Sequence, residues 1–532
     1  MDWADAVNNA KPVGADVNIG GTDQAEYAPP QKATHVIDFN DRLRSDVTEN
    51  QVDTTPRDDW NHKIELAQEM LPLISRLHRE HNAVTSIHGR LLIGLTDIEI
   101  IKAHRYARRI VEKELPLDET LPILRELVEM DLGTASIDLG HLAHLYKESG
   151  QQDLRTFLQE QLADVVGTSS ELEARDVVLY GFGRIGRLLA RILIAREATY
   201  GGVRLRAVVV RKKGDGDITK RASLLRRDSV HGAFNGTITV DKDNEIIWAN
   251  GTPIQMIYAD SPAEIDYTAY GINNAIVVDN TGAWRDRDGL SRHLEAKGVD
   301  RVLLTAPGKG DIPNIVYGIN QDMIGDDKIL SAASCTTNGI TPVLKVINDR
   351  YGVKHGHVET VHSYTNDQNL ADNFHKGPRR GRAAGLNMVL TETGAAKAVA
   401  KALPEFAGKL TGNAIRVPTP DVSMAVINLD LETEVDKDEV NNFLRRVSTD
   451  SNLRQQIDYI HSPEVVSTDL LGSTHAGVVD GLATIASGNH LVLYVWYDNE
   501  YGYSHQVVRV VEDIAGVRPK IYPERTEPSE IK

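Results

Sequence analysis

The feature that most constrains the fold is a glycine pattern between a predicted strand and a predicted helix. Residues 176–180 are mostly apolar and β-branched, as is typical of a buried strand. Gly181, Gly183 and Gly186 follow at once with the spacing Gly-x-Gly-x-x-Gly, and residues 187–196 resemble a helix. Further strands are predicted at residues 203–210, 275–279 and 301–305. This alternation predicts an α/β fold with a Rossmann-type dinucleotide-binding domain.

Each glycine of the pattern has a distinct expected role. Gly181 allows the tight turn, Gly183 lets the backbone approach a pyrophosphate, and Gly186 lets the helix pack closely on the strand. The amides at the start of the helix, those of Arg184 and Ile185, are expected to face the phosphates.

The residues after the second strand bear on the choice of cofactor. A carboxylate is common there and binds the adenine ribose, but this chain has Arg211-Lys212-Lys213. The three cations suit a 2′-phosphate, which favours NADP or use of both cofactors. The alternative is a solvated basic turn that merely weakens the binding of NAD.

The single cysteine of the chain, Cys335, lies between a short apolar run and a predicted helix at residues 340–348. A lone thiol forms no internal disulfide and no cysteine-based metal cluster. Its flanking sequence, Ser334-Cys-Thr-Thr-Asn338, is polar, and the positive end of a helix dipole favours a thiolate. These neighbours favour a nucleophile over an inert buried thiol.

Charge and composition separate the N-terminal third from the rest. The net charge of −17 argues against nonspecific binding of nucleic acid, and acidic residues outnumber basic ones 29 to 17 within residues 1–170. No apolar run is long enough to span a membrane. The acidic N-terminus lacks the pattern of a signal peptide, so we expect a cytoplasmic protein.

The patterns divide the chain into five parts. Residues 1–58 are expected to be a disordered leader. Residues 59–170 are expected to form an all-α bundle that folds as a separate unit, with helices at residues 100–114, 121–130, 141–147 and 154–166. Residues 171–334 are the NAD(P)-binding domain, and residues 335–516 are an α+β catalytic domain whose last helix packs back on it. Residues 517–532 are expected to be a flexible or surface-draped tail.

Seven motifs, in order, make residues 175–515 resemble phosphorylating glyceraldehyde-3-phosphate dehydrogenase. They are Gly181-Phe-Gly-Arg-Ile-Gly186, Asp228-Ser-Val-His-Gly232, Ser334-Cys-Thr-Thr-Asn338, Thr360-Val-His362, Thr393-Gly-Ala-Ala-Lys397, Arg416-Val-Pro-Thr-Pro420 and Trp496-Tyr-Asp-Asn-Glu500. Residues 1–170 have no counterpart in ordinary members of that family.

The resemblance implies a reaction and its two catalytic residues. Cys335 would attack an aldehyde, and His362 would lower the pKa of the thiol as its ion-pair partner and act as acid and base. A hydride would pass to NAD or NADP, and inorganic phosphate would release the resulting thioester as an acyl phosphate. In glycolysis or gluconeogenesis this converts glyceraldehyde 3-phosphate to 1,3-bisphosphoglycerate.

The resemblance also implies the binding residues, here by motif position. The cofactor would contact Gly181, Phe182, Gly183, Arg184, Ile185, Gly186, Arg211, Lys212, Thr281, Asn499 and Tyr503. The substrate phosphate and the attacking phosphate would contact Ser334, Thr336, Thr365, Arg380, Thr393, Gly394 and Arg416. No metal is implied. The partners implied are a small-molecule substrate, inorganic phosphate and three further copies in a homotetramer, with neither nucleic acid nor membrane.

Two alternatives remain open. A relative that oxidises erythrose 4-phosphate or another phosphorylated aldehyde would share the same motifs. A nucleotide-sensing regulatory protein would use the extension to bind an unknown protein partner.

Overall fold

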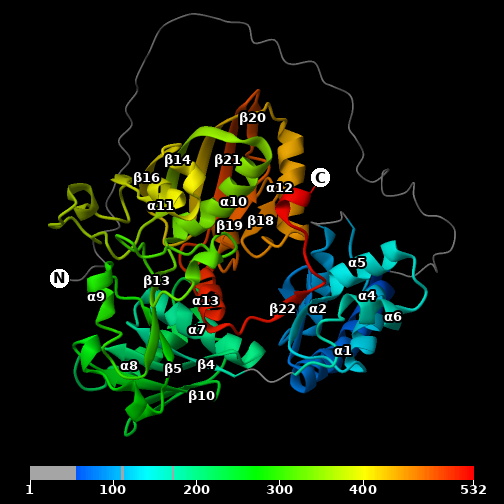
Figure 1. Ribbon diagram of the computed structural model, residues 1–532, viewed down its shortest axis with the longest axis horizontal. Helices are drawn as coiled ribbons and strands as arrows, with labels where there is room; N and C mark the ends of the chain where they lie inside the picture. The colour runs from blue at the N-terminus through cyan, green and yellow to red at the C-terminus, as the bar shows by residue number, and fades with distance from the viewer. Residues whose placement is uncertain (1–55, 109–112, 170–172, 532) are drawn as a thin grey trace, which may run out of the picture. The chain divides into compact units, whose positions relative to one another are not determined.

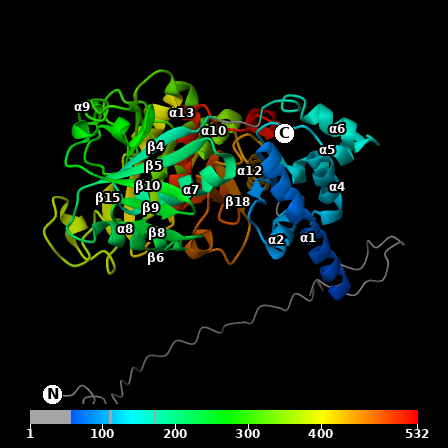
Figure 2. The ribbon, with the colours of Figure 1, turned by 90° about the horizontal axis from the view of Figure 1, so that it is seen from below.

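The computed structural model describes residues 56–108, 113–169 and 173–531 (Figures 1 and 2). Most of the predicted leader, residues 1–55, lies outside the described residues. The part of that leader that is described, residues 56–58, begins a long helix. Residues Trp60–Lys532 form one compact unit.

The nucleotide-binding domain is built on an eight-stranded sheet. Its strand order is β13 (Ile329–Ser331), β12 (Val299–Leu304), β11 (Ala275–Asp279), β4 (Arg175–Tyr180), β5 (Val203–Val210), β10 (Thr252–Tyr258), β9 (Ile246–Ala249) and β8 (Ile238–Asp241). The first six strands are parallel and the last two are antiparallel. Helix α7 (Arg184–Tyr200) follows β4 and packs on the sheet, as the glycine pattern predicts. The Rossmann-type fold is confirmed.

The catalytic domain is built on a mixed sheet. The strand order is β15 (Val389–Glu392), β16 (Leu410–Val417), β14 (Val353–Ser363), β17 (Ser423–Leu431), β21 (His490–Tyr497), β19 (Gly477–Asp480) and β18 (Ile457–Ile460), with β20 (Ile485–Ser487) pairing β21. Helices α10 (Cys335–Tyr351), α11 (Ala395–Ala402) and α12 (Lys437–Asp450) share its core. The last long helix, α13 (Tyr501–Ala515), instead joins the core of the nucleotide-binding domain.

The N-terminal domain is not the all-α bundle that the sequence predicts. Its helices are α1 (Pro56–His81), α2 (Asp97–Arg105), α4 (Leu117–Val128), α5 (Leu139–Ser149) and α6 (Leu154–Gln161). They enclose strands β1 (Ala83–Ile87), β2 (Arg90–Leu91) and β3 (Ala135–Asp138). Both faces of β1 and β3 are buried, so these strands lack the polar–apolar alternation that marks a half-exposed strand.

The helix boundaries of this domain differ from the predicted ones in instructive ways. A capping box of Thr96 and Glu99 opens α2, and Gly150 ends α5 in the left-handed conformation. Helix α2 ends at Arg105, well before residue 114. Helix α4 begins at Leu117, before the predicted start at residue 121, so Pro122 lies inside it; the buried face of the helix outweighs one lost backbone hydrogen bond.

The C-terminal tail is not draped on the surface. Its residues Lys520–Tyr522 form β22, which pairs in parallel with β3 and completes the four-stranded N-terminal sheet. Figure 1 shows β22, in red, beside the blue and cyan elements. Tyr522 is buried in the N-terminal core, whereas Ile531 is buried in the catalytic core. The tail therefore joins the two domains, and the extension is not a separate folding unit.

A buried carboxylate reinforces this junction. Asp138, at the end of β3, accepts hydrogen bonds from Arg454 Nη1 at 2.5 Å and from Arg525 Nη2 at 2.6 Å. The backbone amides of His88 and Gly89 donate to the same carboxylate. Burial raises the pKa of Asp138, but the two guanidinium groups outweigh it and hold the pKa below its usual value.

Candidate active site

The single thiol lies at the start of helix α10, as the sequence predicts. Ser334 caps this helix: its hydroxyl accepts a hydrogen bond from the amide of Thr337 at 3.1 Å. Ala333 adopts a positive φ of 55°, an uncommon conformation for a residue with a Cβ, as the chain turns from β13 into the helix. Cys335 is the first residue of the helix, so its sulfur lies near the positive end of the helix dipole.

Two neighbouring strands bring a histidine and an arginine to the thiol. His362 on β14 and Arg416 on β16 are register partners in the sheet. The Nε2 atom of His362 lies 3.6 Å from Cys335 Sγ, and Arg416 Nη1 lies 2.7 Å from Nδ1 of the same ring. The same Nδ1 also lies 2.8 Å from the carbonyl oxygen of Ser363, to which Arg416 Nη1 donates a hydrogen bond of 2.9 Å.

The charges of this group favour a neutral thiol and a neutral imidazole before substrate binds. Burial and then the charge of Arg416 lower the pKa of His362 to about 3. Burial raises the pKa of Cys335, and the charge of Arg416 opposes that rise. The pKa of the thiol is therefore raised in this state, and the charge that opposes the rise is that of Arg416 rather than an ion pair with His362.

A buried amide, that of Asn499, contacts the residue that follows His362. The carbonyl oxygen of Asn499 accepts hydrogen bonds from Ser363 Oγ at 2.8 Å and from Ser423 Oγ at 2.7 Å. These two contacts fix the side chain of Asn499 and leave its NH₂ group as the donor end. Such an orientation suits the binding of a nicotinamide carboxamide. Ser363 and Ser423 were not predicted from the sequence, because neither hydroxyl belongs to a recognisable spacing.

Two other predicted residues, Thr336 and Tyr503, form hydrogen bonds close to Cys335. Thr336 Oγ1 lies 3.0 Å from the hydroxyl of Tyr497, and both residues are buried. Tyr503 donates a hydrogen bond of 3.1 Å to the carbonyl of Ala333, two residues before Cys335. Both tyrosines thus hold the turn that presents the thiol.

The predicted phosphate residues beyond Arg416 lie in two loops. Arg380 donates to Thr391 Oγ1 at 2.8 Å and to Asp367 Oδ2 at 2.5 Å, so its charge is paired in this state. Thr365 lies half-buried in the loop after β14. Gly394 caps α11, and Thr393 Oγ1 accepts from the amide of Ala395. The start of α11 therefore offers backbone amides to an anion, in keeping with the predicted role of residues 393 and 394.

The glycine turn after β4 fits a dinucleotide. Gly181 has a φ of +102°, and a Cβ on it would come within 3.0 Å of Thr281. A Cβ on Gly186 would lie 2.5 Å from the carbonyl oxygen of Gly181, so only glycine lets α7 start this close to the strand. A Cβ on Gly183 would meet open space, which leaves room for a pyrophosphate. Phe182 and Ile185 pack against the core beneath the turn.

The side chain of Arg184 has another use. It forms ion pairs with Glu500 and with Asp228, and His231 Nε2 lies 3.0 Å from Glu500 Oε2. Only the backbone of Arg184 remains for the phosphates. This charged network joins the predicted motifs at residues 228–232 and 496–500 through Asp228, His231 and Glu500, to which the sequence analysis assigned no role.

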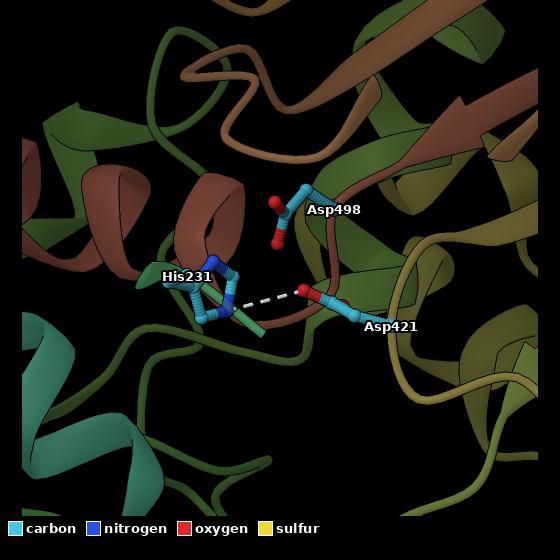
Figure 3. A group of neighbouring side chains, drawn as sticks. All are labelled: His231, Asp421 and Asp498. Atoms are coloured by element: carbon cyan, nitrogen blue, oxygen red, sulfur yellow. Dashed lines mark ion pairs between the residues drawn. The ribbon is translucent and has the colours of Figure 1, made fainter. Parts of the chain in front are cut away.

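His231 also faces two buried aspartates (Figure 3). Its Nε2 lies 3.2 Å from Asp421 Oδ2, and Asp498 lies beside them. Burial lowers the pKa of His231, but Asp421 and Glu500 outweigh it and raise the pKa to about 9. Burial and Asp421 raise the pKa of Asp498 to about 7. In the state described, His231 forms ion pairs with Asp421 and Glu500.

Two carboxylates that are distant in sequence lie near the cations of the predicted 2′-phosphate site. Lys212 Nζ lies 3.2 Å from Glu245 Oε1, and Arg211 Nε lies 3.8 Å from Asp260 Oδ1. Both cations are more than half exposed. The sequence places no carboxylate directly after β5, but the loop before β9 and the end of β10 supply two.

Comparison with known protein families agrees with this geometry. Residues 175–287 match the model of the glyceraldehyde 3-phosphate dehydrogenase NAD-binding domain, and residues 334–499 match that of the C-terminal domain. The chain belongs to the glyceraldehyde-3-phosphate dehydrogenase family. The predicted family is thus confirmed, and with it a nicotinamide-dependent oxidoreductase of α/β fold.

Known relatives are of two kinds. A glyceraldehyde-3-phosphate dehydrogenase-like protein of Pseudomonas aeruginosa is 61% identical over 460 residues, which cover 85% of this chain and all of the relative. This alignment is longer than the chain after residue 170, so it reaches into the N-terminal domain. Glyceraldehyde-3-phosphate dehydrogenase of Priestia megaterium is 39% identical over 338 residues, 63% of this chain and 96% of its own length. Glyceraldehyde-3-phosphate dehydrogenase 2 of Bacillus subtilis is 38% identical over 342 residues.

Among the described residues, none of the helices has the length and apolar character needed to cross a membrane.

Proposed function

We propose that this protein oxidises glyceraldehyde 3-phosphate, with inorganic phosphate and NAD(P)⁺, to 1,3-bisphosphoglycerate through a thioester on Cys335. The observation that carries the proposal is the group formed by Cys335 Sγ, His362 Nε2 at 3.6 Å and Arg416 beside the same imidazole. A nucleophile, an acid–base group and a cation for phosphate thereby meet at one point.

The chain's own residues account for the order of events. As the sulfur of Cys335 attacks the aldehyde carbon, His362 Nε2 takes the thiol proton and passes it to the carbonyl oxygen, which gives a hemithioacetal. His362 Nε2 then takes the hydroxyl proton as a hydride leaves the same carbon, and a thioester remains on Cys335. The nicotinamide, when bound, supplies the hydride acceptor. Attack by inorganic phosphate on the thioester carbonyl releases the acyl phosphate and the thiolate, which recovers its proton from His362.

We infer that Arg416 links binding of the substrate to activation of the base. In the state described, its positive charge lowers the pKa of His362. A substrate phosphate that binds this guanidinium would neutralise the charge beside the ring and raise the pKa of His362 toward the range of a useful base. The base would then be active only once a phosphorylated aldehyde is bound.

We propose NADP, or both cofactors, as the hydride acceptor, since no carboxylate directly follows β5 and Arg211 and Lys212 lie there. A 2′-phosphate would have to compete with Glu245 for Lys212. We further propose a cytoplasmic homotetramer, as the family resemblance implies.

Steady-state turnover of the purified full chain tests the reaction. Glyceraldehyde 3-phosphate should be oxidised only when phosphate or arsenate is present, with a higher kcat/KM than erythrose 4-phosphate. A higher kcat/KM for erythrose 4-phosphate would assign the other substrate. Tight binding of nucleotide without turnover of either aldehyde would favour the regulatory protein instead.

A further inference from the structure

A cavity of about 1100 Å³ is lined by residues of the N-terminal, nucleotide-binding and catalytic domains, and Cys335 is not among them. Its lining includes residues 88–90 and Tyr106 from the N-terminal domain, and Arg196, Arg454 and Arg509 from the rest of the chain. Tyr106 donates a hydrogen bond of 3.3 Å to Asp458 across the same space. None of the residues that we assign to the reaction lines this cavity.

The inner wall carries more buried positive charge than negative charge. Arg509, 4% exposed, forms none of the ion pairs found among the described residues. Its Nη1 donates to two backbone carbonyls and to Gln506, and its Nε has no hydrogen-bond partner. Arg454, 6% exposed, must share the carboxylate of Asp138 with Arg525, and its Nε is likewise unpartnered.

Two histidines of the same wall can take up a proton. Neither ring nitrogen of His505 has a hydrogen-bond partner, and both are shielded from solvent. Burial, followed by the charges of Arg509 and Arg196, holds the pKa of His505 well below its usual value. Burial also lowers the pKa of His475, and Arg509, Arg90 and Arg454 contribute to that shift. The cations at this wall are thus close enough to repel a further positive charge.

The carboxylates that line the cavity do not neutralise this wall. Asp458 lies against Tyr106 and His475. Glu464 and Asp469 are exposed residues of the 460–473 loop, at the rim. Arg196 has a carboxylate of its own, Glu512, at 3.4 Å. A buried guanidinium without a counter-ion is costly, and an incoming anion would relieve that cost.

We propose that this cavity is a binding site for an organic phosphate, with Arg509 and Arg454 as its anion-binding residues and His505 as a group that gains a proton on binding. The planar guanidinium group matches phosphate oxygens in pairs. The volume lies at the upper end for small-molecule sites, and Tyr106, Tyr200 and Tyr501 offer aromatic walls to the organic part. The site does not depend on the reaction proposed above.

Helix α13 gives such a ligand a route to the active site. His505 and Arg509 lie on this helix, and so does Tyr503, which holds the carbonyl of Ala333 beside the catalytic turn. Asn499 lies in the segment that leads into the same helix.

Calorimetry on the full chain saturated with NADP tests the proposal, with ATP, inorganic pyrophosphate and adenosine as probes. ATP and pyrophosphate should bind, and adenosine should not. If ATP binds more tightly than pyrophosphate, the ligand of the cavity is an organic phosphate. Equal affinities would indicate an inorganic phosphate and would overturn the proposal that the ligand has an organic part. Arg509→Gln should weaken ATP binding at least about tenfold, the share expected of one charge-assisted hydrogen bond. Arg518→Gln is the matched control, because this half-buried arginine lies outside the cavity wall and should leave binding unchanged.

A second variant covers the case in which Arg509→Gln does not fold. Wild-type binding should take up protons, seen as a dependence of the binding enthalpy on the buffer's ionisation enthalpy, and His505→Gln should remove most of that uptake. Absence of ATP binding at millimolar concentration would overturn the proposal. So would ATP binding that Arg509→Gln leaves unchanged, or proton uptake that His505→Gln leaves unchanged.

Discussion

Replacing Asp138 with asparagine removes the carboxylate that pairs with two buried arginines at the junction of the N-terminal domain with the rest of the chain. Asparagine keeps the shape of the side chain, but its single amide oxygen can accept from only one of the backbone amides of His88 and Gly89, which donate to different oxygens of Asp138. The side chains of Arg454 and Arg525 are each 5% exposed, so neither can regain its hydration without opening the junction. The charge, rather than the packing, is therefore what the substitution tests.

The expected loss of stability follows from that burial. Removing one partner of a buried ion pair costs about 3–5 kcal/mol, and Asp138→Asn leaves two guanidinium groups uncompensated. We therefore expect the free energy of unfolding to fall by about 4 kcal/mol. The tail strand β22 pairs with β3 just before Asp138, so its backbone amides should exchange with deuterium faster in the variant.

Urea unfolding and hydrogen exchange on the full chain measure both effects. Asp118→Asn is the matched control, because Asp118 pairs with His62 at an exposed site of the same domain and should cost less than about 1 kcal/mol. A loss below about 1 kcal/mol for Asp138→Asn, with unchanged exchange in β22, would refute the view that this carboxylate joins the domains. By the same reasoning, a chain lacking residues 1–170 should expose β22 and lose solubility.

Three further predictions concern the active site and its surroundings. Cys335→Ser should abolish aldehyde oxidation, and His362→Asn should lower kcat about 10²- to 10⁴-fold; a smaller loss would deny His362 the acid–base role. Lys212→Asp should shift the ratio of kcat/KM for NADP and NAD toward NAD, and an unchanged ratio would place the 2′-phosphate elsewhere. Because the folded pKa of His231 is raised to about 9, its contribution to stability is complete below about pH 6.5 and is lost as the pH rises through 9. The free energies of unfolding of wild type and His231→Gln, measured in urea, should therefore differ by about 1–2 kcal/mol at pH 6.5, after allowance for screening, and should converge above pH 9. A difference that persists at high pH would contradict this prediction.

The parts of the fold that the sequence predicts well are those specified by local chemistry. The glycine turn at residues 181–186 was predicted because Gly181 adopts a conformation that favours glycine, whereas the helix after the thiol begins at Cys335, five residues before its predicted start. His362 and Arg416 were found by motif alone, but their contact depends on the pairing of β14 with β16, which no local pattern specifies.

The parts that the sequence does not predict depend on residues far apart in the chain. Strand β22 is three residues long and has no stable partner until β3, almost 400 residues earlier, lies beside it. Its composition therefore resembles that of a loop. The carboxylates of Glu245 and Asp260 come to the 2′-phosphate site in the same way, through strand pairing rather than sequence proximity.

A single turnover in the absence of phosphate tests the central claim most directly. Full-length protein mixed with glyceraldehyde 3-phosphate and NADP⁺ should release one equivalent of NADPH per chain in a burst, and intact-protein mass spectrometry should find the acyl group on the peptide that contains Cys335. Addition of phosphate should then discharge the acyl group and restart turnover. A burst without acylation of Cys335, or acylation at another residue, would contradict the account.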